Sequence, residues 1–226
     1  MHITAKGVSK SYAKGSRTIE ALKPTDIELH SGRLTVIFGR SGSGKTTLMN
    51  ILAGLLKPTA GSVFFDDTDI YSLTDGELSQ RRSKEVGYIP QGQSGLSMLT
   101  VRENILLPTA VIGSESARQR VDELLRTLGL TKLAGAYPNE LSGGELRRLA
   151  IARALINSPQ MICADEPTND LDDENTRLIF ELLKNTAEEG AAVVVVTHDS
   201  AAEEFADIVY RMDGGELKQA SPLSPF

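Results

Sequence analysis

The sequence predicts an α/β fold with a mostly parallel central sheet, an N-terminal antiparallel β subdomain and an inserted α-helical subdomain. Three observations predict this fold. Continuous apolar runs such as Leu34–Phe38 and Ala192–Thr197 are typical of parallel strands that are covered on both faces. Such runs alternate with helical patterns toward both ends of the chain. Between them, residues 74–158 repeat apolar residues at the three- and four-residue spacing of helices.

The composition is that of a globular chain with an aliphatic core. Of the 226 residues, 40% are hydrophobic, 5% are aromatic and none is tryptophan. The net charge of −6, without a block of Lys or Arg, argues against a nucleic-acid surface, so we expect no nucleic-acid partner. The single cysteine, Cys163, cannot form an intrachain disulfide and is interpreted as a small buried residue in a reducing compartment.

No stretch predicts a signal peptide or a membrane-spanning helix. The first residues lack the basic and apolar regions of a signal peptide. The longest apolar run, Ala191–Val196, is far shorter than the roughly 20 residues that a spanning helix needs. We therefore expect a cytoplasmic protein that reaches the inner face of a membrane only through a partner.

The first 73 residues are expected to form strands and then a strand–loop–helix unit. Strand-like stretches cover His2–Val8 and Ile27–Leu29, with a polar loop around residues 14–16 between them. The strand Leu34–Phe38 leads through a glycine-rich loop into a helix expected over Thr46–Leu55. This order of elements is the context that a phosphate-binding loop requires.

Residues 74–158 form the expected helical insert. Its expected helices are Asp75–Lys84, Val101–Ile112, Ala117–Leu128 and Gly144–Ile156. Thr74, Thr100 and Ser116 are the expected N-caps of the first three. Pro108 is expected to kink or split the second helix, because proline removes a helical hydrogen bond.

The α/β alternation resumes after Pro159. The expected elements are strand Met161–Ala164, helix Asn175–Thr186, strand Ala192–Thr197, helix Ser200–Phe205 and strand Ile208–Arg211. We assign residues 1–73 and 159–218 to one α/β nucleotide-binding core within a single domain, and residues 219–226 to a flexible tail. No internal repeat is present, so the chain carries one such unit.

The glycine-rich loop matches the phosphate-loop pattern in full. It reads Gly39, Arg40, Ser41, Gly42, Ser43, Gly44, Lys45, Thr46, and Thr47 follows. The glycines let backbone N–H groups face phosphates, toward which the next helix directs its positive end. Lys45 is predicted to reach the β- and γ-phosphates of a nucleoside triphosphate, and the Thr46 hydroxyl to coordinate Mg²⁺. The alternative is a glycine-rich turn that matches by chance.

Asp165 and Glu166 end an apolar strand and supply the carboxylates of a hydrolysis site. Asp165 is predicted to hold Mg²⁺ through metal-bound water, and Glu166 to orient the attacking water or accept its proton. A pair of carboxylates that only caps a helix is the alternative. Another motif lies in the helical insert and begins with Ser142, Gly143 and Gly144. It is typical of a capped helix start and equally of a second anion site.

The joint arrangement of these motifs resembles the ABC ATPases, a family of phosphate-loop NTPases, from about residue 2 to residue 218. The resemblance implies ATP and Mg²⁺ as the bound group. It implies that Tyr12 stacks on adenine, that Gln91 contacts Mg²⁺ and the catalytic water, and that His198 holds the γ-phosphate. Asn169–Asp172 resembles the D-loop of the family, in which Asp172 is the matching acid. Taken alone, such residues are usually packing, solvated or structural.

The resemblance also implies a homodimer that forms on ATP binding. Two copies would pack head to tail, so that Ser142, Gly143 and Gly144 contact, in trans, the ATP held by the other copy's Lys45. If the γ-phosphate shifts a dimer equilibrium from 1:99 to 99:1, it favours closure by about 5.5 kcal/mol. A few charge-assisted hydrogen bonds of about 1.5–3 kcal/mol each are sufficient.

The segment Leu99–Pro108 and the D-loop resemble ATPases of the lipoprotein-release, macrolide-export and antimicrobial-peptide-resistance type. That type implies separate transmembrane permease subunits, and export or mechanotransmission. Three departures are present: the loop Gly92–Met98 is more polar than expected, Asn169 and Asp170 replace small residues, and Leu146 stands where glutamine is common.

Four alternatives remain open at this point. They are a soluble ABC ATPase acting on DNA or ribosomes, the ATPase of an ABC importer, a binding module that scarcely hydrolyses ATP, and a small-molecule kinase. The intact Glu166 argues against the binding module, and the motif at Ser142 argues against the kinase.

Overall fold

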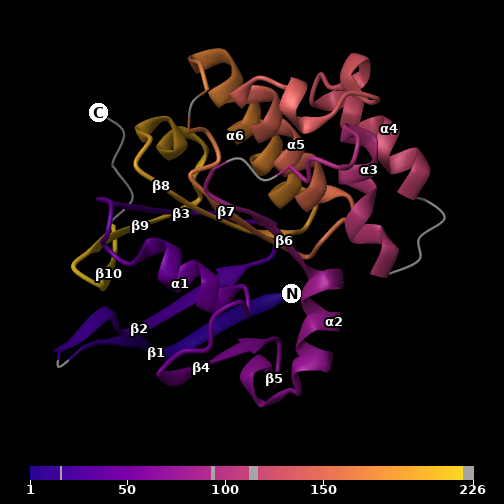
Figure 1. The fold of residues 1–226 in the computed structure, drawn as a ribbon. Helices are drawn as coiled ribbons and strands as arrows, with labels where there is room; N and C mark the ends of the chain where they lie inside the picture. The colour runs from indigo at the N-terminus through magenta and orange to yellow at the C-terminus, as the bar shows by residue number, and fades with distance from the viewer. Residues whose placement is uncertain (16, 93–94, 112–116, 170, 221–226) are drawn as a thin grey trace.

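The computed structural model describes residues 1–15, 17–92, 95–111, 117–169 and 171–220. Its two sheets lie on either side of the helix α1 (Lys45–Leu52), and most of the other long helices cover the opposite face of the larger sheet (Figure 1). The expectations at Ser116, Asp170 and most of the tail 219–226 fall outside the described residues, whereas Gln219 ends a strand.

The larger sheet has six strands in the order β10-β9-β3-β8-β7-β6. Its strands are β3 (Leu34–Gly39), β6 (Val86–Ile89), β7 (Met161–Asp165), β8 (Ala192–Thr197), β9 (Ile208–Asp213) and β10 (Glu216–Gln219). All neighbours pair in parallel except β9 and β10, which form an antiparallel hairpin. Every residue of β7 and β8 is buried, Cys163 included, as continuous apolar runs predict.

The smaller sheet is antiparallel, with the order β2-β1-β4-β5. Its strands are β1 (His2–Lys14), β2 (Arg17–His30), β4 (Ala60–Phe65) and β5 (Thr68–Asp69). The N-terminal β subdomain is thus confirmed, although the sequence patterns placed no strand at Ala60–Phe65. Its inner face packs with α1 against one face of the larger sheet, in a core that includes Ile3, Leu48 and Val194.

The helical part packs on the other face of the larger sheet. Its elements on that face are α3 (Val101–Leu106), α4 (Ala117–Thr127) and α5 (Gly143–Leu155), and α6 (Asp173–Glu188) lies beside them. The helix α2 (Asp75–Glu85) lies on the α1 side instead, where its buried Leu78 joins the core with Leu48 and Ile70. Short 3-10 segments span Ile70–Ser72, Leu107–Val111, Thr131–Leu133, Pro138–Glu140 and Ser200–Phe205. None of the helices among the described residues is long and apolar enough to cross a membrane.

The sequence placed several helix boundaries correctly. Thr74 and Thr100 cap α2 and α3 through capping boxes, in which the serine or threonine and a glutamate three residues later bond each other's backbone N–H. The helix expected over Val101–Ile112 is corrected to α3, which ends at Leu106. Pro108 lies in the 3-10 segment that follows, because its ring and missing N–H stop the regular helix.

Two local details differ from what the sequence predicts. No strand is expected within the mostly helical insert, but Val86–Ile89 forms β6, which pairs in parallel with β7 at the edge of the larger sheet. Four residues between a charged helix and Pro90 are too few to show a periodicity. The helix expected over Ser200–Phe205 is a 3-10 helix, which suits a segment of only six residues.

Candidate active site

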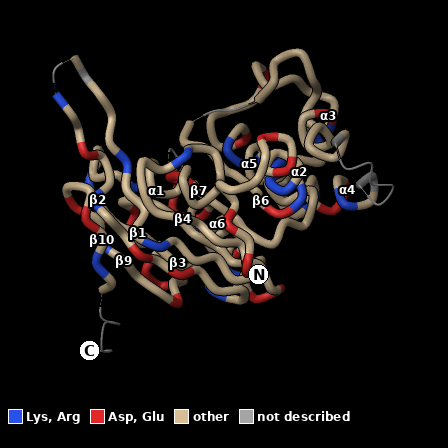
Figure 2. The backbone as a smooth tube through the Cα atoms, turned by 90° about the horizontal axis from the view of Figure 1, so that it is seen from below, with Lys and Arg blue, Asp and Glu red and all other residues tan. Residues whose placement is uncertain are grey.

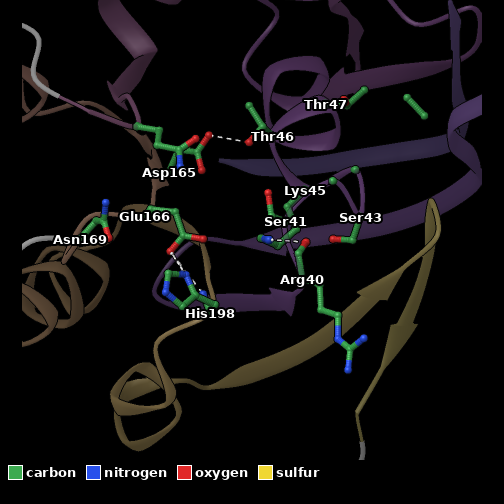
Figure 3. A pocket seen from close by; sticks show the side chains of 14 residues that line it. Arg40, Ser41, Ser43, Lys45, Thr46, Thr47, Asp165, Glu166, Asn169 and His198 are labelled. Atoms are coloured by element: carbon green, nitrogen blue, oxygen red, sulfur yellow. Dashed lines mark hydrogen bonds and ion pairs between the residues drawn. The ribbon is translucent and has the colours of Figure 1, made fainter.

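The candidate site lies at the carboxyl ends of β3, β7 and β8, which are neighbours in the larger sheet. Because the three strands are parallel, the residues that follow each of them meet at one edge. Gly39 ends β3, Asp165 ends β7 and His198 follows β8. Residues more than 150 positions apart in the chain therefore face one pocket (Figure 3).

The loop from Gly39 to Lys45 turns tightly because two of its glycines adopt conformations that other residues avoid. Gly42 and Gly44 have φ of 78° and 106°. A Cβ at Gly44 would also lie 2.5 Å from the carbonyl oxygen of Ala21 in β2. The loop is thus wedged between the two sheets, and it delivers the N-terminus of α1 to the pocket.

Lys45 is buried, with 7% of its surface exposed, and its ammonium group turns back over the loop. Nζ donates hydrogen bonds to the carbonyl oxygens of Gly39, at 2.6 Å, and Arg40, at 3.1 Å. A buried ammonium group needs such acceptors. The lysine is held within the loop that the sequence predicted to surround phosphates.

Thr46 and Asp165 are in direct contact. The Thr46 hydroxyl donates to Asp165 Oδ2 at 2.8 Å, which joins the first turn of α1 to the end of β7. Burial raises the pKa of Asp165 above its ordinary value, and Glu166 next to it acts in the same direction, although the Thr46 hydrogen bond, Lys45 and Arg147 oppose the rise. The carboxylate is therefore desolvated and well suited to a cation.

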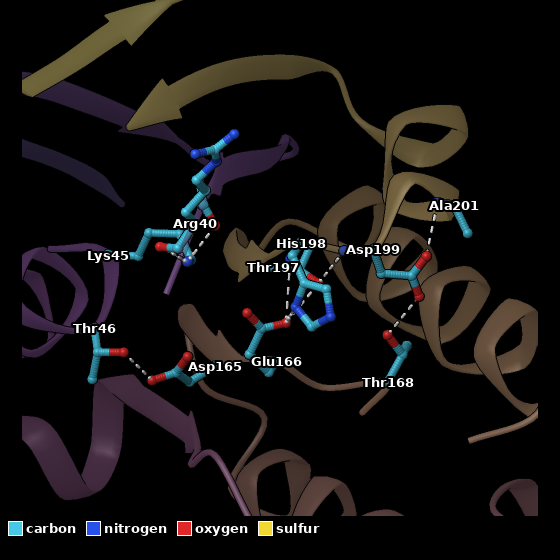
Figure 4. A network of polar contacts seen from close by, with 11 residues as sticks. Arg40, Lys45, Thr46, Asp165, Glu166, Thr168, Thr197, His198, Asp199 and Ala201 are labelled. Carbon is cyan, nitrogen blue, oxygen red and sulfur yellow. Dashed lines mark hydrogen bonds and ion pairs between the residues drawn. The ribbon is translucent and has the colours of Figure 1, made fainter. Parts of the chain in front are cut away.

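Glu166 has a strained backbone and a firmly held side chain. Its φ of 46° is unusual for a residue other than glycine, and its N–H donates to the Val196 carbonyl at 2.9 Å. Oε2 accepts from the Thr197 hydroxyl at 2.9 Å and the His198 N–H at 3.3 Å. In Figure 4 the other carboxylate oxygen points toward Lys45.

His198 is the exposed member of the site, with 70% of its side chain accessible. Its Nδ1 lies 3.0 Å from Glu166 Oε2, and its ring faces the pocket (Figures 3 and 4). The next residue, Asp199, accepts from the Thr168 hydroxyl at 2.9 Å, and its N–H donates to Thr197 Oγ1 at 3.0 Å. The loop after β8 is thus tied to the segment after β7.

These residues enclose a pocket of about 500 Å³. Its lining is Ala21, Arg40, Ser41, Gly42, Ser43, Gly44, Lys45, Thr46, Thr47, Gln91, Asp165, Glu166, Asn169 and His198. Sequence reasoning missed Ala21, which arrives from the smaller sheet, and the supporting residues Thr168, Thr197 and Asp199. Only their places next to predicted residues, in the Pro-Thr-Asn and Thr-His-Asp sequences, pointed to Thr168, Thr197 and Asp199.

Several predicted residues lie outside this lining. Gly39 supports the loop from beneath, where a Cβ would meet the Met212 carbonyl oxygen at 2.4 Å. Tyr12 is 42% exposed on β1, opposite Ile19, two residues along β2 from the pocket-lining Ala21. Its ring also contacts the Lys10 ammonium group, at 5.4 Å.

Ser142, Gly143 and Gly144 begin α5, and they too are outside the pocket lining. The Ser142 hydroxyl caps the helix: it accepts from the Glu145 N–H at 3.3 Å and donates to Glu145 Oε2 at 2.8 Å. Asp172 likewise caps α6, because Oδ1 accepts from the Asn175 N–H at 2.8 Å. The capping role expected for Ser142 is confirmed, and Asp172 has one as well.

Gln91 links the pocket to the helical part. It is exposed, lines the pocket and follows Pro90, whose carbonyl oxygen accepts from Arg147 Nη1 at 2.7 Å. Arg147 is buried in α5. This hydrogen bond ties α5 to the backbone next to Gln91.

The parallel sheet, the glycine loop wrapped around a lysine and the paired carboxylates define a phosphate-loop nucleoside triphosphatase. A family model described as an ABC transporter matches residues 22–169. The chain belongs to this family, as one of its ATP-binding ATPase subunits. The recognised resemblance and the expected fold class are thereby confirmed.

The relatives extend over the whole chain. It is 39% identical to the uncharacterized ABC transporter ATP-binding protein MJ0796 of Methanocaldococcus jannaschii, over 99% of this chain and 98% of that protein. It is 38% identical to the lipoprotein-releasing system ATP-binding protein LolD of Saccharophagus degradans, over 96% of each. The methionine import ATP-binding protein MetN 1 of Rhodococcus jostii is 36% identical over 98% of this chain and 66% of its own length.

Solved structures agree with these relatives. A dimeric structure of a post-hydrolysis state of the ATP-binding cassette MJ0796, bound to ADP and Pi, superposes with a TM-score of 0.91. It is 36% identical and covers 98% of this chain and 99% of the other. A second dimeric structure of MJ0796, described as a bacterial ABC transporter cassette, has a TM-score of 0.90.

Proposed function

We propose that the chain binds and hydrolyses ATP with Mg²⁺ in a head-to-tail homodimer, and that closure of this dimer drives separate transmembrane permease subunits. The observation that carries the proposal is the meeting of Lys45, Thr46, Asp165, Glu166 and His198 around one pocket. ADP and Pi in the related MJ0796 cassette support the same reaction.

The phosphate groups of ATP fit the loop and the N-terminus of α1. Lys45 Nζ donates to two neutral carbonyl oxygens, at 2.6 and 3.1 Å. Phosphate oxygens carry charge, so they form stronger, charge-assisted bonds with the ammonium group. Tyr12, exposed on the neighbouring hairpin, is the proposed stacking partner of the adenine ring.

The donor set at Thr46 and Asp165 fits Mg²⁺. This ion prefers oxygen ligands, and the exposed Thr46 and the buried Asp165 present side-chain oxygens only 2.8 Å apart at the wall of the pocket. The side-chain amide oxygen of Gln91 is the third proposed donor. When bound, Mg²⁺ neutralises charge that develops on the transferring phosphoryl group.

Glu166 is the proposed base. A water molecule attacks the γ-phosphorus, the bond from that phosphorus to the oxygen bridging it to the β-phosphate breaks, and ADP and phosphate result. The glutamate oxygen that points toward Lys45 orients the water and accepts its proton, while Thr197 and His198 hold Oε2. His198, the most exposed of the three, is the proposed contact to the γ-phosphate.

The second half of each site is proposed to come from a second copy. Ser142, Gly143 and Gly144 are outside the pocket of their own chain, yet they form a helix N-terminus suited to an anion. The two dimeric MJ0796 cassettes support this assembly.

The proposed permease contact lies next to Gln91. A second cavity, of about 320 Å³, is lined by residues of β6, α2 and α5, including Tyr88 and Pro90. Exposed apolar side chains lie on the segments that follow β6: Met98 is 88% exposed and Leu96 46%. The loop that appeared polar in sequence therefore offers apolar contacts to a partner at the inner face of the membrane.

The similarity to LolD favours an export or mechanotransmission system, and the similarity to MetN 1 keeps an importer as the second candidate. Lys and Arg are interspersed with Asp and Glu over the described chain (Figure 2), which gives no support to a DNA- or ribosome-bound ATPase. Isolation of the permease that co-purifies with the chain separates the candidates. A permease with four membrane spans and a large outer domain supports mechanotransmission, and one with about ten spans supports import.

The experiment on the proposed reaction is Glu166→Gln. The amide keeps the side-chain shape but cannot accept the proton, so ATP turnover should fall by roughly a hundredfold or more. ATP should still bind, and the variant should elute as a dimer in size-exclusion chromatography with light scattering. Turnover equal to that of the wild type would remove Glu166 from its proposed role.

A further inference from the structure

Two of the three histidines of the chain lie together on the smaller sheet, away from the ATP pocket. His2 and His30 are directly opposite each other in the pairing of β1 with β2. Their rings stack, with centroids 4.9 Å apart and planes 12° from parallel. Glu28 lies two residues before His30 on the same face of β2, because side chains alternate along a strand and the intervening Leu29 is buried.

The polar atoms of these three residues converge. Glu28 Oε2 is 3.5 Å from His2 Nε2 and 3.8 Å from His30 Nε2. All three potential ligand atoms lie within 4.8 Å of one another. Two ligand atoms that each lie about 2.0–2.1 Å from a tetrahedral zinc ion are about 3.4 Å apart. The two glutamate–histidine distances are within a few tenths of an ångström of that spacing, whereas the histidine pair, whose ligand atoms are up to 4.8 Å apart, has to close by up to about 1.4 Å, with rotation of the exposed rings.

The backbone holds the first of these residues in place. The His2 N–H donates to Asp66 Oδ1 at 2.8 Å, and the Asp66 N–H donates to the His2 carbonyl at 2.8 Å. β1 is also paired on both sides, with β2 and with β4. Both ligand-bearing strands are thus fixed before an ion binds, which reduces the entropy lost on binding.

We propose that His2, His30 and Glu28 form a binding site for one transition-metal dication of the Zn²⁺ class. Two imidazole nitrogens and a carboxylate oxygen are the ligands that Zn²⁺ accepts, with the fourth position left to water or another ligand. Mg²⁺ strongly prefers oxygen and dehydrates reluctantly, so the ion that accompanies ATP does not compete. The bound ion would join the start of β1 to the end of β2, just before the turn that leads into β3.

The test is a zinc titration of the full chain, prepared without a histidine tag, against a chromophoric zinc indicator. The wild type should take up one Zn²⁺ per chain with saturation, in the presence of excess Mg²⁺. Titration with Co²⁺ should give the strong visible absorption of a tetrahedral site. His30→Asn and Glu28→Gln should each lose the saturable uptake.

The third histidine provides the matched control. His198→Asn removes an exposed imidazole beside a carboxylate in the ATP pocket, and it should retain zinc uptake in full. The side chains of His2 and His30 are each 47% exposed and that of Glu28 is 58% exposed, so their replacement leaves the core intact. Circular dichroism checks that each variant is folded.

A thermal measurement gives an independent readout. At a Zn²⁺ concentration of about one hundred times Kd, the unfolding midpoint of the wild type should rise by roughly 5–10 °C, and that of His30→Asn should not rise. ATP turnover of His30→Asn in zinc-free buffer should equal that of the wild type. If zinc uptake is absent from the wild type, is not saturable or persists in His30→Asn, the cluster is only an ion-paired surface group and the proposal is overturned.

Discussion

At the scale of single residues, the charge of Asp165 favours the proposed binding of a cation but lowers the stability of the nucleotide-free fold. Its carboxylate is buried at the end of β7, one residue from Glu166 and 2.8 Å from the Thr46 hydroxyl. Burial raises its pKa, so the folded chain binds a proton at Asp165 more readily than the unfolded chain. The stability that this group contributes is therefore lost as the pH rises from the ordinary aspartate pKa through the raised pKa. At pH 7 the ionised carboxylate destabilises the nucleotide-free protein.

Asp165→Asn should relieve that destabilisation. The amide has no charge to desolvate and its oxygen still accepts from Thr46, so the nucleotide-free protein should unfold at a higher temperature at pH 7. The gain over the wild type should shrink as the pH is lowered toward 4, because the wild-type carboxyl then takes up its proton. Differential scanning calorimetry at several pH values measures this, and ATP turnover should be lost in parallel. A variant that is less stable than the wild type at pH 7 contradicts the argument.

The residues of the site divide according to whether their contacts are local in sequence. Lys45 and Thr46 were predictable, because the loop, the lysine and the helix start are consecutive. The support of Glu166 by Thr197 was not, because it depends on β7 and β8 lying side by side in register. The left-handed backbone at Glu166 is likewise imposed by that neighbouring strand and has no local signal.

At the scale of elements, helix starts serve two purposes. α3 and α5 begin with the same capping box, in which Thr100 and Ser142 bond to a glutamate three residues later. Thr100 lies in no proposed contact with ATP, whereas Ser142 is proposed to contact the ATP of a second copy. Comparison of the two therefore distinguishes a cap that only stabilises its helix from a cap that is also proposed to bind ATP.

Thr100→Ala and Ser142→Ala should each destabilise the fold by about 1 kcal/mol, because each removes one cap. Urea unfolding measures that loss. Only Ser142→Ala should also weaken ATP-induced dimerisation and turnover, since Thr100 is the matched control. Equal turnover in the two variants would mean that Ser142 is a cap and nothing more.

The contact between β6 and α5 gives a second test of an element. A Cβ at Gly87 would lie 2.5 Å from the Ala154 carbonyl oxygen and 2.9 Å from Pro159 Cγ, so the strand and the helix would have to separate. Gly87→Ala should therefore destabilise the protein by about 1–3 kcal/mol. Gly76→Ala in α2 is the control: its Cβ meets nothing within 4 Å, and it should be neutral or up to about 1 kcal/mol more stable. Chemical denaturation compares the two, and equal stabilities would refute the close packing.

The same element shows where pattern reading fails. β6 is only four residues long, and its alternating burial arises from the β7 edge and from α5, which are distant in sequence. The helical stretches on either side carry clear periodicity, so the sequence predicts a mostly helical range 74–158 and no strand within it. The strand Ala60–Phe65 was missed because Gly61 and Ser62 weaken its apolar run.

At the scale of the whole molecule, the larger sheet separates two apolar cores. Side chains alternate along β3, so Val36 belongs to the core under the helical part and Ile37 to the core shared with α1 and the smaller sheet. The phosphate loop lies at the edge where both meet. Ser142 belongs to one side and Tyr12 to the other, which suits a site that two copies complete between them.

Mixing two inactive variants tests that assembly. Lys45→Ala removes the phosphate contact of its own chain, and Ser142→Ala removes the contact offered to the partner. Each homodimer has a defect in both sites, but a mixed dimer has one intact site and one doubly defective site. An equimolar mixture should therefore contain intact sites at about one quarter of the wild-type number, if pairing is random.

ATP turnover of the mixture, compared with each variant alone, measures this recovery. A mixture no more active than its components would place Ser142 in the same site as Lys45 of its own chain, against the head-to-tail arrangement. Unmixed variants, each assayed at the total protein concentration of the mixture, are the control for concentration-dependent pairing.

The burial of Cys163 in β7 has a practical consequence. The thiol is closed off on all sides in the middle of the larger sheet, and burial raises its pKa, so it offers no thiolate to a reagent while the sheet is intact. A cysteine introduced on the surface would accept a fluorescent or spin label selectively, without removal of the native one. Distances between labels on two chains would then follow the opening and closing of the proposed dimer in real time, while the native thiol of Cys163 remains unlabelled.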